Sequence, residues 1–386
     1  MILSYEYKKD ENTILNETPK AALEGLVSGN KNKLILGENL QILKTLLDDY
    51  KEKIDLIYID PPFATNETFK IGNIRANTIS SSRNDEIAYS DTRLGADYLE
   101  FIRERLVFLR ELLASHGSIY LHIDYKIGHY VKLIMDEIFG IKNFRNDITR
   151  IKCNPKNFQR KGYGNIKDLI LFYSKSDSPR WNNPTISFSS ADEDRLFKKI
   201  DKDGRKYTTI PLHAPGETAH GNTGMPWRGI NPPKGRHWRS EPSILEEIDR
   251  NGFIEWSSKG VPRKKIYLDE KKGKKMQDIW EFKDPQYPKY PTEKNFNLLK
   301  FIIEASSDEG DLILDCFAGS GTTLVAAQEL NRNWIGIDES KAAINVARER
   351  LLNIPNNLFG QTGFDFLIQK NLFFDNTGKV FASSAN

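Results

Sequence analysis

Residues 311–323 read Asp-Leu-Ile-Leu-Asp-Cys-Phe-Ala-Gly-Ser-Gly-Thr-Thr, an apolar strand followed by a glycine-rich loop that opens a helix. A strand that leads into a helix N-terminus is the usual site for a nucleotide-like cofactor, because the first N–H groups of the helix point at the ligand. Gly319 and Gly321 permit positive φ and a close approach of the backbone to that ligand. The loop lacks the lysine of a P-loop, and Leu324 stands where a dinucleotide fingerprint has its third glycine. The stretch therefore predicts an α/β fold whose cofactor loop is neither a P-loop nor a dinucleotide fingerprint.

A second strand, residues 334–338, follows the helix and ends at Asp338, with Glu339 next. A carboxylate at this strand end can accept hydrogen bonds from the two hydroxyls of a ribose. An acidic cap on the following helix explains the same residues, and the sequence leaves both interpretations open.

Far upstream, the apolar run 54–59 leads directly into Asp60, Pro61, Pro62 and Phe63. The carboxylate of Asp60 and the carbonyl of Pro61 can each accept one N–H of an exocyclic amine, while the ring of Phe63 stacks on the base. The two prolines fix φ, so these acceptors are in place before a substrate arrives. An ordinary turn after a strand is the competing interpretation.

Together these stretches resemble the amino-methyltransferases of DNA, in which the Asp-Pro-Pro-aromatic tetrapeptide holds the target base and the Phe-x-Gly-x-Gly loop binds S-adenosylmethionine. Here the tetrapeptide comes first and the cofactor loop last, which is similar to the β-group of these enzymes, including the modification subunits of type III restriction systems. The resemblance extends from about Leu34 to Ile354. It implies methyl transfer from S-adenosylmethionine to the N6 amine of adenine in a flipped base. N4-cytosine, whose enzymes more often carry Ser at the position of Asp60, is the alternative target.

The resemblance assigns roles to individual residues. Asp60, Pro61, Pro62 and Phe63 are expected to be catalytic. A larger set is expected to contact the cofactor: Asp315, Phe317, Gly319, Ser320, Gly321, Thr322, Asp338, Glu339, Thr292, Lys294 and Glu38. Lys294 lies in a segment similar to the family's Pro-Thr-x-Lys-Pro, with Asn295 in place of the second proline, and we expect it to pair with the methionine carboxylate. For Glu38, a helix N-cap is an equally good explanation.

Periodicity predicts how these motifs are arranged. Helices are expected at 98–114 and 128–139, and buried strands at 118–123 and 168–173, the latter with an aromatic that the resemblance places near the target base. Strands alternating with helices indicate a doubly wound, Rossmann-like, mostly parallel sheet, here in circularly permuted motif order. Residues 30–175 would form the catalytic half, 291–353 the cofactor-binding half, 151–290 an inserted target-recognition region, and 354–386 a tail of unknown role. The polar stretch 64–97 is expected to be a long loop.

Charge is distributed unevenly along the chain. The net charge is +3, but residues 151–290 contain 28 Lys and Arg against 18 Asp and Glu, with five of the six Trp and 12 of the 17 Pro. A basic, aromatic, loop-rich insert beside an acidic core predicts contact with the phosphates of double-stranded DNA. The expected DNA contacts are Arg228, Arg236, Trp238, Arg239, Lys264 and Lys265. A loop-rich subdomain with tryptophans in a small core is the alternative.

The rest of the composition sets limits on function. No apolar run reaches the length of a membrane span and the N-terminus lacks a signal-peptide pattern, so a cytoplasmic protein is expected. Cys153 and Cys316 do not follow a proline, which argues against carbon-5 cytosine chemistry, and no metal site is expected. We take a restriction endonuclease and, because of phenylalanines in the tail, a second copy of the chain as candidate partners. A chain that serves chiefly as the DNA-recognition subunit of a restriction complex is the alternative from another class.

Overall fold

The structure is a computed structural model that describes residues 2–26, 28–62, 68–71, 76–77, 86–90, 95–155, 161–218, 220–285, 294–354, 363–370, 372–374 and 380–382. The chain divides into two compact units. The first consists of Met1–Pro184 and Gln277–Asn386, and the second is Thr185–Met276. No helix in the described part of the chain is both long and apolar enough to span a membrane.

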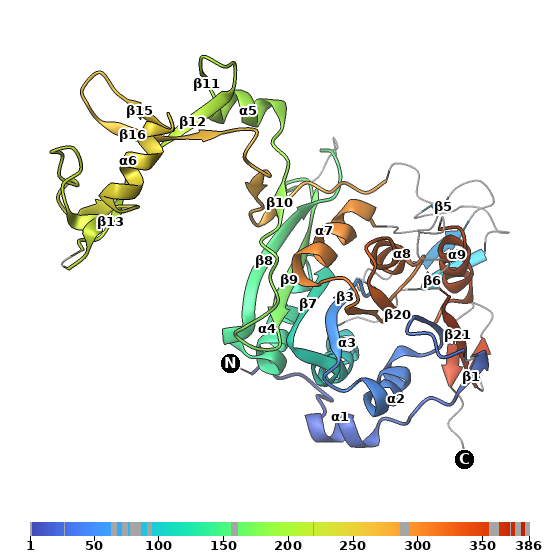
Figure 1. The fold of residues 1–386 in the computed structure, drawn as a ribbon. Helices are drawn as coiled ribbons and strands as arrows, with labels where there is room; N and C mark the ends of the chain where they lie inside the picture. The colour runs from blue at the N-terminus through green and yellow to red at the C-terminus, as the bar shows by residue number, and fades with distance from the viewer. Residues whose placement is uncertain are drawn as a thin grey trace. The chain divides into compact units, whose positions relative to one another are not determined.

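A 10-stranded sheet in the order β1-β21-β2-β20-β19-β3-β7-β9-β8-β18 is the centre of the first unit (Figure 1). Its strands are β1 Leu23–Leu26, β2 Lys33–Leu36, β3 Ile54–Ile59, β7 Leu113–Ile123, β8 Phe144–Ile151, β9 Lys167–Ser174, β18 Ile279–Trp280, β19 Leu312–Asp315, β20 Asn333–Asp338 and β21 Asp365–Gln369. Six neighbouring strands in this order, β21, β2, β20, β19, β3 and β7, pair in parallel. β1 and β9 pair antiparallel with their neighbours, so the sheet is mixed but mostly parallel.

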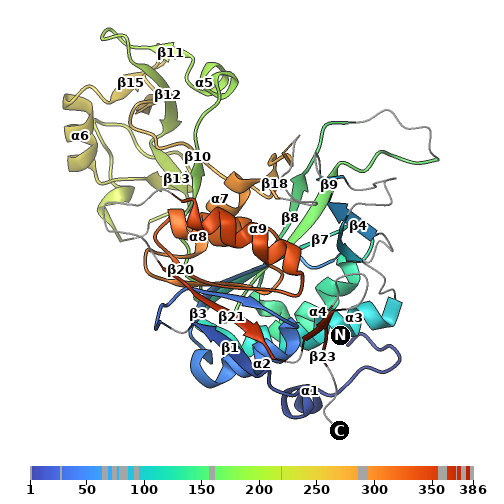
Figure 2. The same ribbon diagram turned by 90° about the vertical axis from the view of Figure 1, so that its right-hand side faces the viewer.

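Helices cover both faces of this sheet. Figure 2 shows α7, α8 and α9 on one face and α1 to α4 on the other. The helices are α1 Glu11–Glu17, α2 Asn39–Tyr50, α3 Gly95–Leu112, α4 Gly128–Phe139, α7 Phe296–Ser306, α8 Thr322–Glu329 and α9 Lys341–Leu352, with a 3-10 turn at Ile141–Asn143. The strands between them are buried on both faces, and their sequences are therefore almost continuously apolar, as in β3 and β19.

The predicted core elements are present with small changes at their ends. α3 begins at Gly95, three residues before the expected start at residue 98. It ends at Leu112, and β7 begins at Leu113, within the range 98–114 expected to be helical. α4 has the expected bounds and ends at Gly140, whose φ of +87° favours glycine. Strand 168–173 is β9, and its aromatics have partners within the protein. Tyr173 faces α4 and donates to Asp136, and Phe172 stacks on Tyr120 with ring centroids 4.3 Å apart.

The second unit is narrower than the predicted region 151–290. β9 and β18, both inside that range, pair within the main sheet. The unit contains β10 Thr185–Ile186, α5 Ser190–Leu196, β11 Lys199–Ile200, β12 Lys206–Pro211, β13 His213–Pro215, a 3-10 turn at Asn222–Gly224, β14 Arg236–Trp238, α6 Pro242–Arg250, β15 Ile254–Trp256, β16 Pro262–Tyr267 and β17 Lys274–Lys275. Strands β11, β12, β16 and β15 form its largest sheet.

Two other segments differ from expectation. The stretch 64–97, expected to be a loop, contains a small sheet of β4 Thr68–Ile71, β5 Ala76–Asn77 and β6 Glu86–Ser90, and the start of α3. The tail 354–386 contributes β21 to the main sheet, followed by the pair β22 Leu372–Phe374 and β23 Val380–Ala382. Phe364 packs on Trp334, and the guanidinium of Arg348 lies over the ring of Phe366. Contacts within the chain therefore explain these two phenylalanines, on which the expectation of a second copy partly rested.

Candidate active site

The predicted motifs meet at one edge of the main sheet. β3 ends at Ile59 just before Asp60, β19 ends at Asp315, and β20 ends at Asp338. β19 pairs in parallel with both neighbours, so the three carboxyl ends emerge side by side. The chain leaves β3 toward β7 on one side and leaves β19 toward β20 on the other. Open α/β sheets bind ligands in the crevice at such a switch point.

Asp60 has two differently placed carboxylate oxygens. Oδ2 lies 2.7 Å from Nζ of Lys294. Oδ1 is buried and has no hydrogen-bond partner among the described residues. A buried hydrogen-bond acceptor without a donor destabilises the folded protein, so it is typical of a group whose donor is supplied by a ligand. The loop that carries Asp60 is fixed nearby, because the hydroxyl of Tyr98 donates to the carbonyl of Pro62 at 2.5 Å.

Lys294 was expected to meet a cofactor carboxylate, and in the structure it pairs with the carboxylate of Asp60. Its side chain is 11% exposed and that of Asp60 is 17% exposed, so water screens this ion pair only weakly. An ammonium group has three donors and can serve a second acceptor as well. Phe63 and Thr292, both predicted site residues, lie outside the described residues.

The two glycines of the cofactor loop have different surroundings. Gly319 has φ of +50° and Gly321 has φ of +76°. A Cβ on Gly321 would lie 2.8 Å from Cβ of Ala347 in α9, so this glycine lets α9 pack against the loop. A Cβ on Gly319 would meet nothing within 4 Å. Open space beside a backbone with positive φ is the geometry that a closely approaching ligand requires.

Asp315 shapes this loop from the inside. Its carboxylate accepts hydrogen bonds from the N–H of Phe317 at 3.0 Å and from the hydroxyl of Thr323 at 2.6 Å. Burial raises the pKa of Asp315 to about 7, and the two hydrogen bonds only partly offset this rise. These hydrogen bonds give Asp315 a role inside the loop, and its contact with the cofactor stays a prediction.

Asp338 connects the two strand ends. Its carboxylate accepts from the N–H of Gly319 and from the N–H of Ser340, both at 2.8 Å. Burial raises the pKa of Asp338 to about 6 although both hydrogen bonds lower it. The side chain is half-buried, as is that of Glu339 beside it. This position at the end of β20 fits the predicted contact with ribose hydroxyls.

Ser320 and Thr322 both contact α9. Nη1 of Arg350 in α9 lies 3.0 Å from Oγ of Ser320 and 3.1 Å from Oγ1 of Thr322. Both side chains are buried. These hydroxyls hold α9 against the loop, and their contact with the cofactor stays a prediction.

Glu38 is the N-cap of α2 and accepts from the N–H groups of Leu40 and Gln41. Its carboxylate also pairs with Arg105 of α3 at 2.5 Å. The helix-cap interpretation is therefore sufficient for Glu38. Its neighbour Asn39 donates to the carbonyl of Cys316 at 2.7 Å and thereby connects α2 to the cofactor loop.

A buried polar network that the sequence did not predict lies next to Asp60. The hydroxyl of Tyr58 is 2.9 Å from Nδ1 of His122, and Nε2 of His122 is 3.4 Å from Asp168. Lys152 donates to Asp168 at 2.6 Å, and Arg150 pairs with Asp168. The members come from β3, β7, β8 and β9, so no spacing within one motif could have revealed the network.

The chemistry of this network follows from its burial. Burial lowers the pKa of His122 and raises the pKa of Tyr58, so the imidazole is neutral and the phenol is protonated near pH 7. Burial alone would raise the pKa of Asp168, but the hydrogen bond from His122 and the hydrogen bond and charge of Lys152 outweigh it and lower that pKa. With the Nε2 proton directed at Asp168, Nδ1 accepts from Tyr58.

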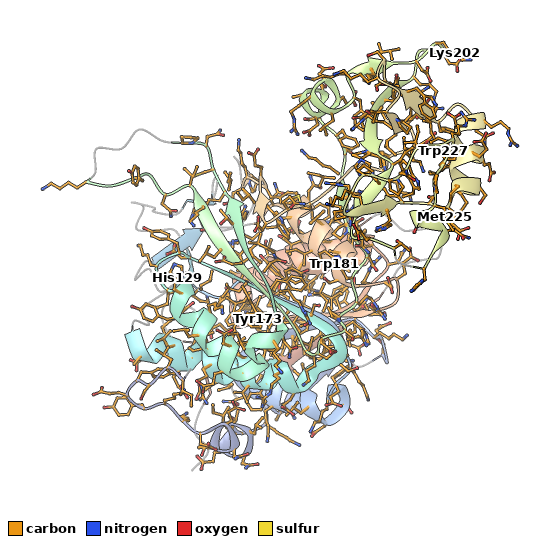
Figure 3. The ribbon with its side chains drawn as sticks, turned by 90° about the vertical axis from the view of Figure 1, so that its left-hand side faces the viewer. His129, Tyr173, Trp181, Lys202, Met225 and Trp227 are labelled. Carbon is orange, nitrogen blue, oxygen red and sulfur yellow. The ribbon has the colours of Figure 1, made fainter. Side chains whose placement is uncertain are left out.

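The second unit has its own core, and two predicted DNA contacts belong to it. Trp238 is buried and its indole N–H donates to the carbonyl of Met225, which argues against stacking of this ring on a base. Arg228 pairs with Glu246 and Asp249. Figure 3 labels Trp227 in the same core, where it stacks on Trp256.

The other four predicted contacts are less constrained. Arg236 is exposed and interacts with His213, and Arg239 donates to the carbonyl of Pro211. Lys264 and Lys265 lie half-buried on β16. In the described residues, no group of three His, Cys, Asp or Glu side chains is placed to hold a metal ion.

Comparison with known proteins identifies the relatives of this chain. Residues 54–349 match the N6/N4 methyltransferase family, described as DNA methylase. The type II methyltransferase M.EcaI of Enterobacter cloacae is 41% identical over 361 residues, which cover 90% of this chain and 77% of that protein. The type III StyLTI Mod subunit of Salmonella typhimurium is 25% identical over 78% of this chain, and the matched region is only 50% of its length. Among solved structures, the M1.HpyAVI–SAM complex covers 82% of this chain and 99% of its own, with 18% identity and a TM-score of 0.44.

Proposed function

Because the chain belongs to the N6/N4 family of DNA methylases, we propose that it methylates the N6 amine of adenine in duplex DNA at a specific sequence. The observation that carries this proposal is the buried, unpartnered Oδ1 of Asp60 at the edge of the sheet that also holds the cofactor loop. The choice of adenine rests on Asp60 itself, since the resembling N4-cytosine enzymes more often have Ser there.

S-adenosylmethionine is the methyl donor of this family, and the residues at the switch point fit it. The open space beside Gly319 accommodates a close ligand, and the carboxylate of Asp338 ends the neighbouring strand. We assign Gly319, Asp338 and Glu339 to its adenosyl part, with Phe317 and Thr292 as further contacts. When bound, S-adenosylmethionine supplies an electrophilic methyl group on sulfur.

Asp60 activates the amine by accepting its protons. The exocyclic nitrogen of adenine is a poor nucleophile because its lone pair is delocalised into the ring. Oδ1 of Asp60 accepts one N–H and the carbonyl of Pro61 accepts the other, which favours a pyramidal nitrogen with a free lone pair. Lys294 holds Oδ2 so that Oδ1 keeps its direction, and this preorganisation lowers the barrier. After transfer the nitrogen is acidic, and its extra proton leaves to Asp60 or to water.

The base reaches this site by leaving the helix. Its amine is otherwise paired, and a carboxylate at the end of β3 cannot approach it inside the duplex. Phe63 is proposed to stack on the flipped ring. The second unit is proposed to recognise the sequence, with Arg236, Arg239, Lys264 and Lys265 as the candidates that remain for contacts with bases or phosphates.

The biological setting follows from the relatives. We propose a cytoplasmic restriction-modification enzyme with a restriction endonuclease as its partner in the system. The chain is 41% identical to the type II methyltransferase M.EcaI but only 24–27% identical to three type III Mod subunits, which supports the type II arrangement. The order of the tetrapeptide before the cofactor loop is proposed to be a circular permutation of the methyltransferase fold.

The decisive experiment identifies the product. The protein is incubated with S-adenosylmethionine and mixed-sequence duplex DNA, the DNA is digested to nucleosides, and the methylated nucleoside is identified by mass. N6-methyladenine is expected for the wild-type protein. Asp60→Ala should abolish it while cofactor binding, measured by calorimetry, persists. N4-methylcytosine would overturn the choice of target, and the absence of any methylated nucleoside would overturn the proposed activity.

A further inference from the structure

The turn of the β8–β9 hairpin lies at the edge of the main sheet where β3 ends and Asp60 follows. Figure 1 shows the two strands of the hairpin side by side. β8 is antiparallel to β9, and β9 is antiparallel to β7, so the turn between β8 and β9 lies at the carboxyl ends of β3 and β7. Neighbouring strands are about 4.8 Å apart, which puts β9 and β8 at about 10 Å and 14 Å from β3 across the sheet. The hairpin and the catalytic carboxylate belong to one compact unit.

The hairpin also rises above the level of the catalytic loop. Ile59 pairs with Leu121, and Leu121 pairs with Leu171, so these three residues lie at one level. Lys167 is four residues further along β9. At about 3.3 Å per residue, Lys167 lies about 13 Å beyond that level.

The root of the hairpin is fixed. The N–H of Lys152 donates to the carbonyl of Ile166 at 2.9 Å, which continues the ladder beyond the two strands. Arg150 is fully buried, donates to the carbonyl of Phe282 and pairs with Asp284. Asp168 forms ion pairs with both Lys152 and Arg150. These two cations are therefore neutralised within the protein.

The outer part of the hairpin carries two exposed lysines and an exposed aromatic ring. Residues 152–167 include five Lys and Arg and no Asp or Glu. Lys161 and Lys167 are exposed, and Tyr163, between Gly162 and Gly164, is 96% exposed. A single exposed aromatic is common on protein surfaces, but an aromatic on a basic segment without acidic residues is the pattern that binds phosphates and stacks on bases.

We propose that this hairpin is a second DNA-contacting element, separate from the Thr185–Met276 unit, with Lys161 and Lys167 on phosphates and Tyr163 stacked on a base beside the flipped nucleotide. The inference rests on the proposed function, because a base that enters the site of Asp60 must come from a duplex lying over this edge. The backbone of that duplex then passes within reach of the hairpin, whose two strands lie about 10–14 Å from β3 at about 4.8 Å per strand.

Salt dependence tests the contribution of the lysines. Binding of a fluorescent mixed-sequence duplex is measured at several salt concentrations for the wild-type protein and for the double variant Lys161→Ala, Lys167→Ala. Each phosphate contact contributes about 0.9 to the slope of log K against log salt concentration, so the slope should decrease by about 2. Lys142→Ala is the matched control, because Lys142 is exposed at the opposite end of β8 and should leave the slope unchanged.

Methylation rates test the contribution of the ring. Tyr163→Ala should lower kcat/KM for DNA about tenfold, since base stacking contributes about 1–3 kcal/mol, and should leave cofactor affinity unchanged. Tyr163→Phe keeps the ring and should retain the rate. The control is Tyr7→Ala, which removes another highly exposed tyrosine, 83% accessible, in the N-terminal segment.

The outcomes separate the two proposals. An active wild-type enzyme whose hairpin variants keep both the salt slope and the rate would overturn the hairpin proposal and leave the proposed function intact. A wild-type protein that methylates no DNA would overturn both. Equal losses in Tyr163→Ala and Tyr163→Phe would contradict stacking, because only the hydroxyl differs between the native residue and phenylalanine.

Discussion

At the scale of the residue, Asp60 shows how one carboxylate can serve two purposes. Oδ2 is held by Lys294 at 2.7 Å, which fixes the rotamer, and Oδ1 is left without a partner in the described structure. An unpaired buried acceptor destabilises the folded protein by about 1–3 kcal/mol. The amine of the substrate would remove this cost by completing the hydrogen bond. The free energy recovered in this way would contribute to binding of the flipped base.

Substitution of Lys294 separates its two candidate roles. Lys294→Gln removes the charge that orients Asp60, so we expect kcat for methyl transfer to decrease about tenfold or more, in line with the loss of a preorganised electrostatic partner. The affinity for S-adenosylmethionine, measured by calorimetry, should change little. Lys300→Gln is the control, because Lys300 lies in α7 and pairs with Glu329 at the surface.

The opposite result would be equally informative. A large loss of cofactor affinity with an unchanged rate of transfer at saturating cofactor would mean that Lys294 binds the methionine carboxylate, as the sequence suggested, and that its contact with Asp60 is incidental.

At the scale of the element, the two glycines of the cofactor loop predict different losses. Gly321→Ala combines strain at φ of +76° with a contact of 2.8 Å to Cβ of Ala347, so it should lower the free energy of unfolding by about 2–3 kcal/mol. Gly319→Ala adds only the strain, about 1 kcal/mol, but fills the open space beside the loop. In urea unfolding, Gly321→Ala should therefore be the less stable variant. In cofactor titration, Gly319→Ala should show the larger loss of affinity in proportion to its loss of stability.

The buried carboxylate of Asp315 predicts a pH dependence of stability. Its pKa is raised by burial from 3.8 to about 7, so the folded protein keeps a proton that the unfolded chain releases. The contribution of this group to stability is full below about pH 4 and decreases as the pH rises toward 7, by up to about 1.4 kcal/mol per pH unit. Asp315→Asn, which cannot ionise, should lose this decrease. Unfolding by urea at a series of pH values measures the difference, and parallel curves for the two proteins would contradict the assignment.

Sequence patterns predicted the elements far better than the contacts between them. The strand, loop and helix around Gly319 and the helix ending at Gly140 follow from local apolar periodicity and from backbone requirements of glycine. The pairing of Lys294 with Asp60 joins residues more than 230 positions apart, and His122 reaches Tyr58 and Asp168 only because three strands become neighbours. The contact of the Ser320 hydroxyl with Arg350 was not predicted for a similar reason, since the two residues are 30 positions apart.

At the scale of the whole molecule, the second unit begins and ends at one place. Thr185 of β10 pairs with Lys275 of β17, and Ile186 pairs with Lys274. Paired residues on antiparallel strands are about 5 Å apart. The chain thus leaves and re-enters the first unit through neighbouring positions, and the large sheet receives no strand from Thr185–Met276.

Excision of this unit should therefore leave the first unit folded. A variant in which a short Gly-Ser linker joins Pro184 to Gln277 is expected to bind S-adenosylmethionine with wild-type affinity and to unfold cooperatively. Its methylation of plasmid DNA should fall at least about a hundredfold and lose sequence preference, because specific binding commonly exceeds non-specific binding by about a thousandfold or more. Sequencing of the modified positions measures the preference. Retention of a single methylated sequence would place recognition in the first unit.

The sheet order has a consequence for synthesis of the protein on the ribosome. β2, at residues 33–36, lies between β20 and β21, which are completed about 300 residues later. Until those strands emerge, both edges of β2 present unpaired N–H and C=O groups, and such edges invite association with other chains. We expect nascent chains stalled before residue 333 to depend on chaperones for solubility, and release of the full chain to coincide with closure of the sheet.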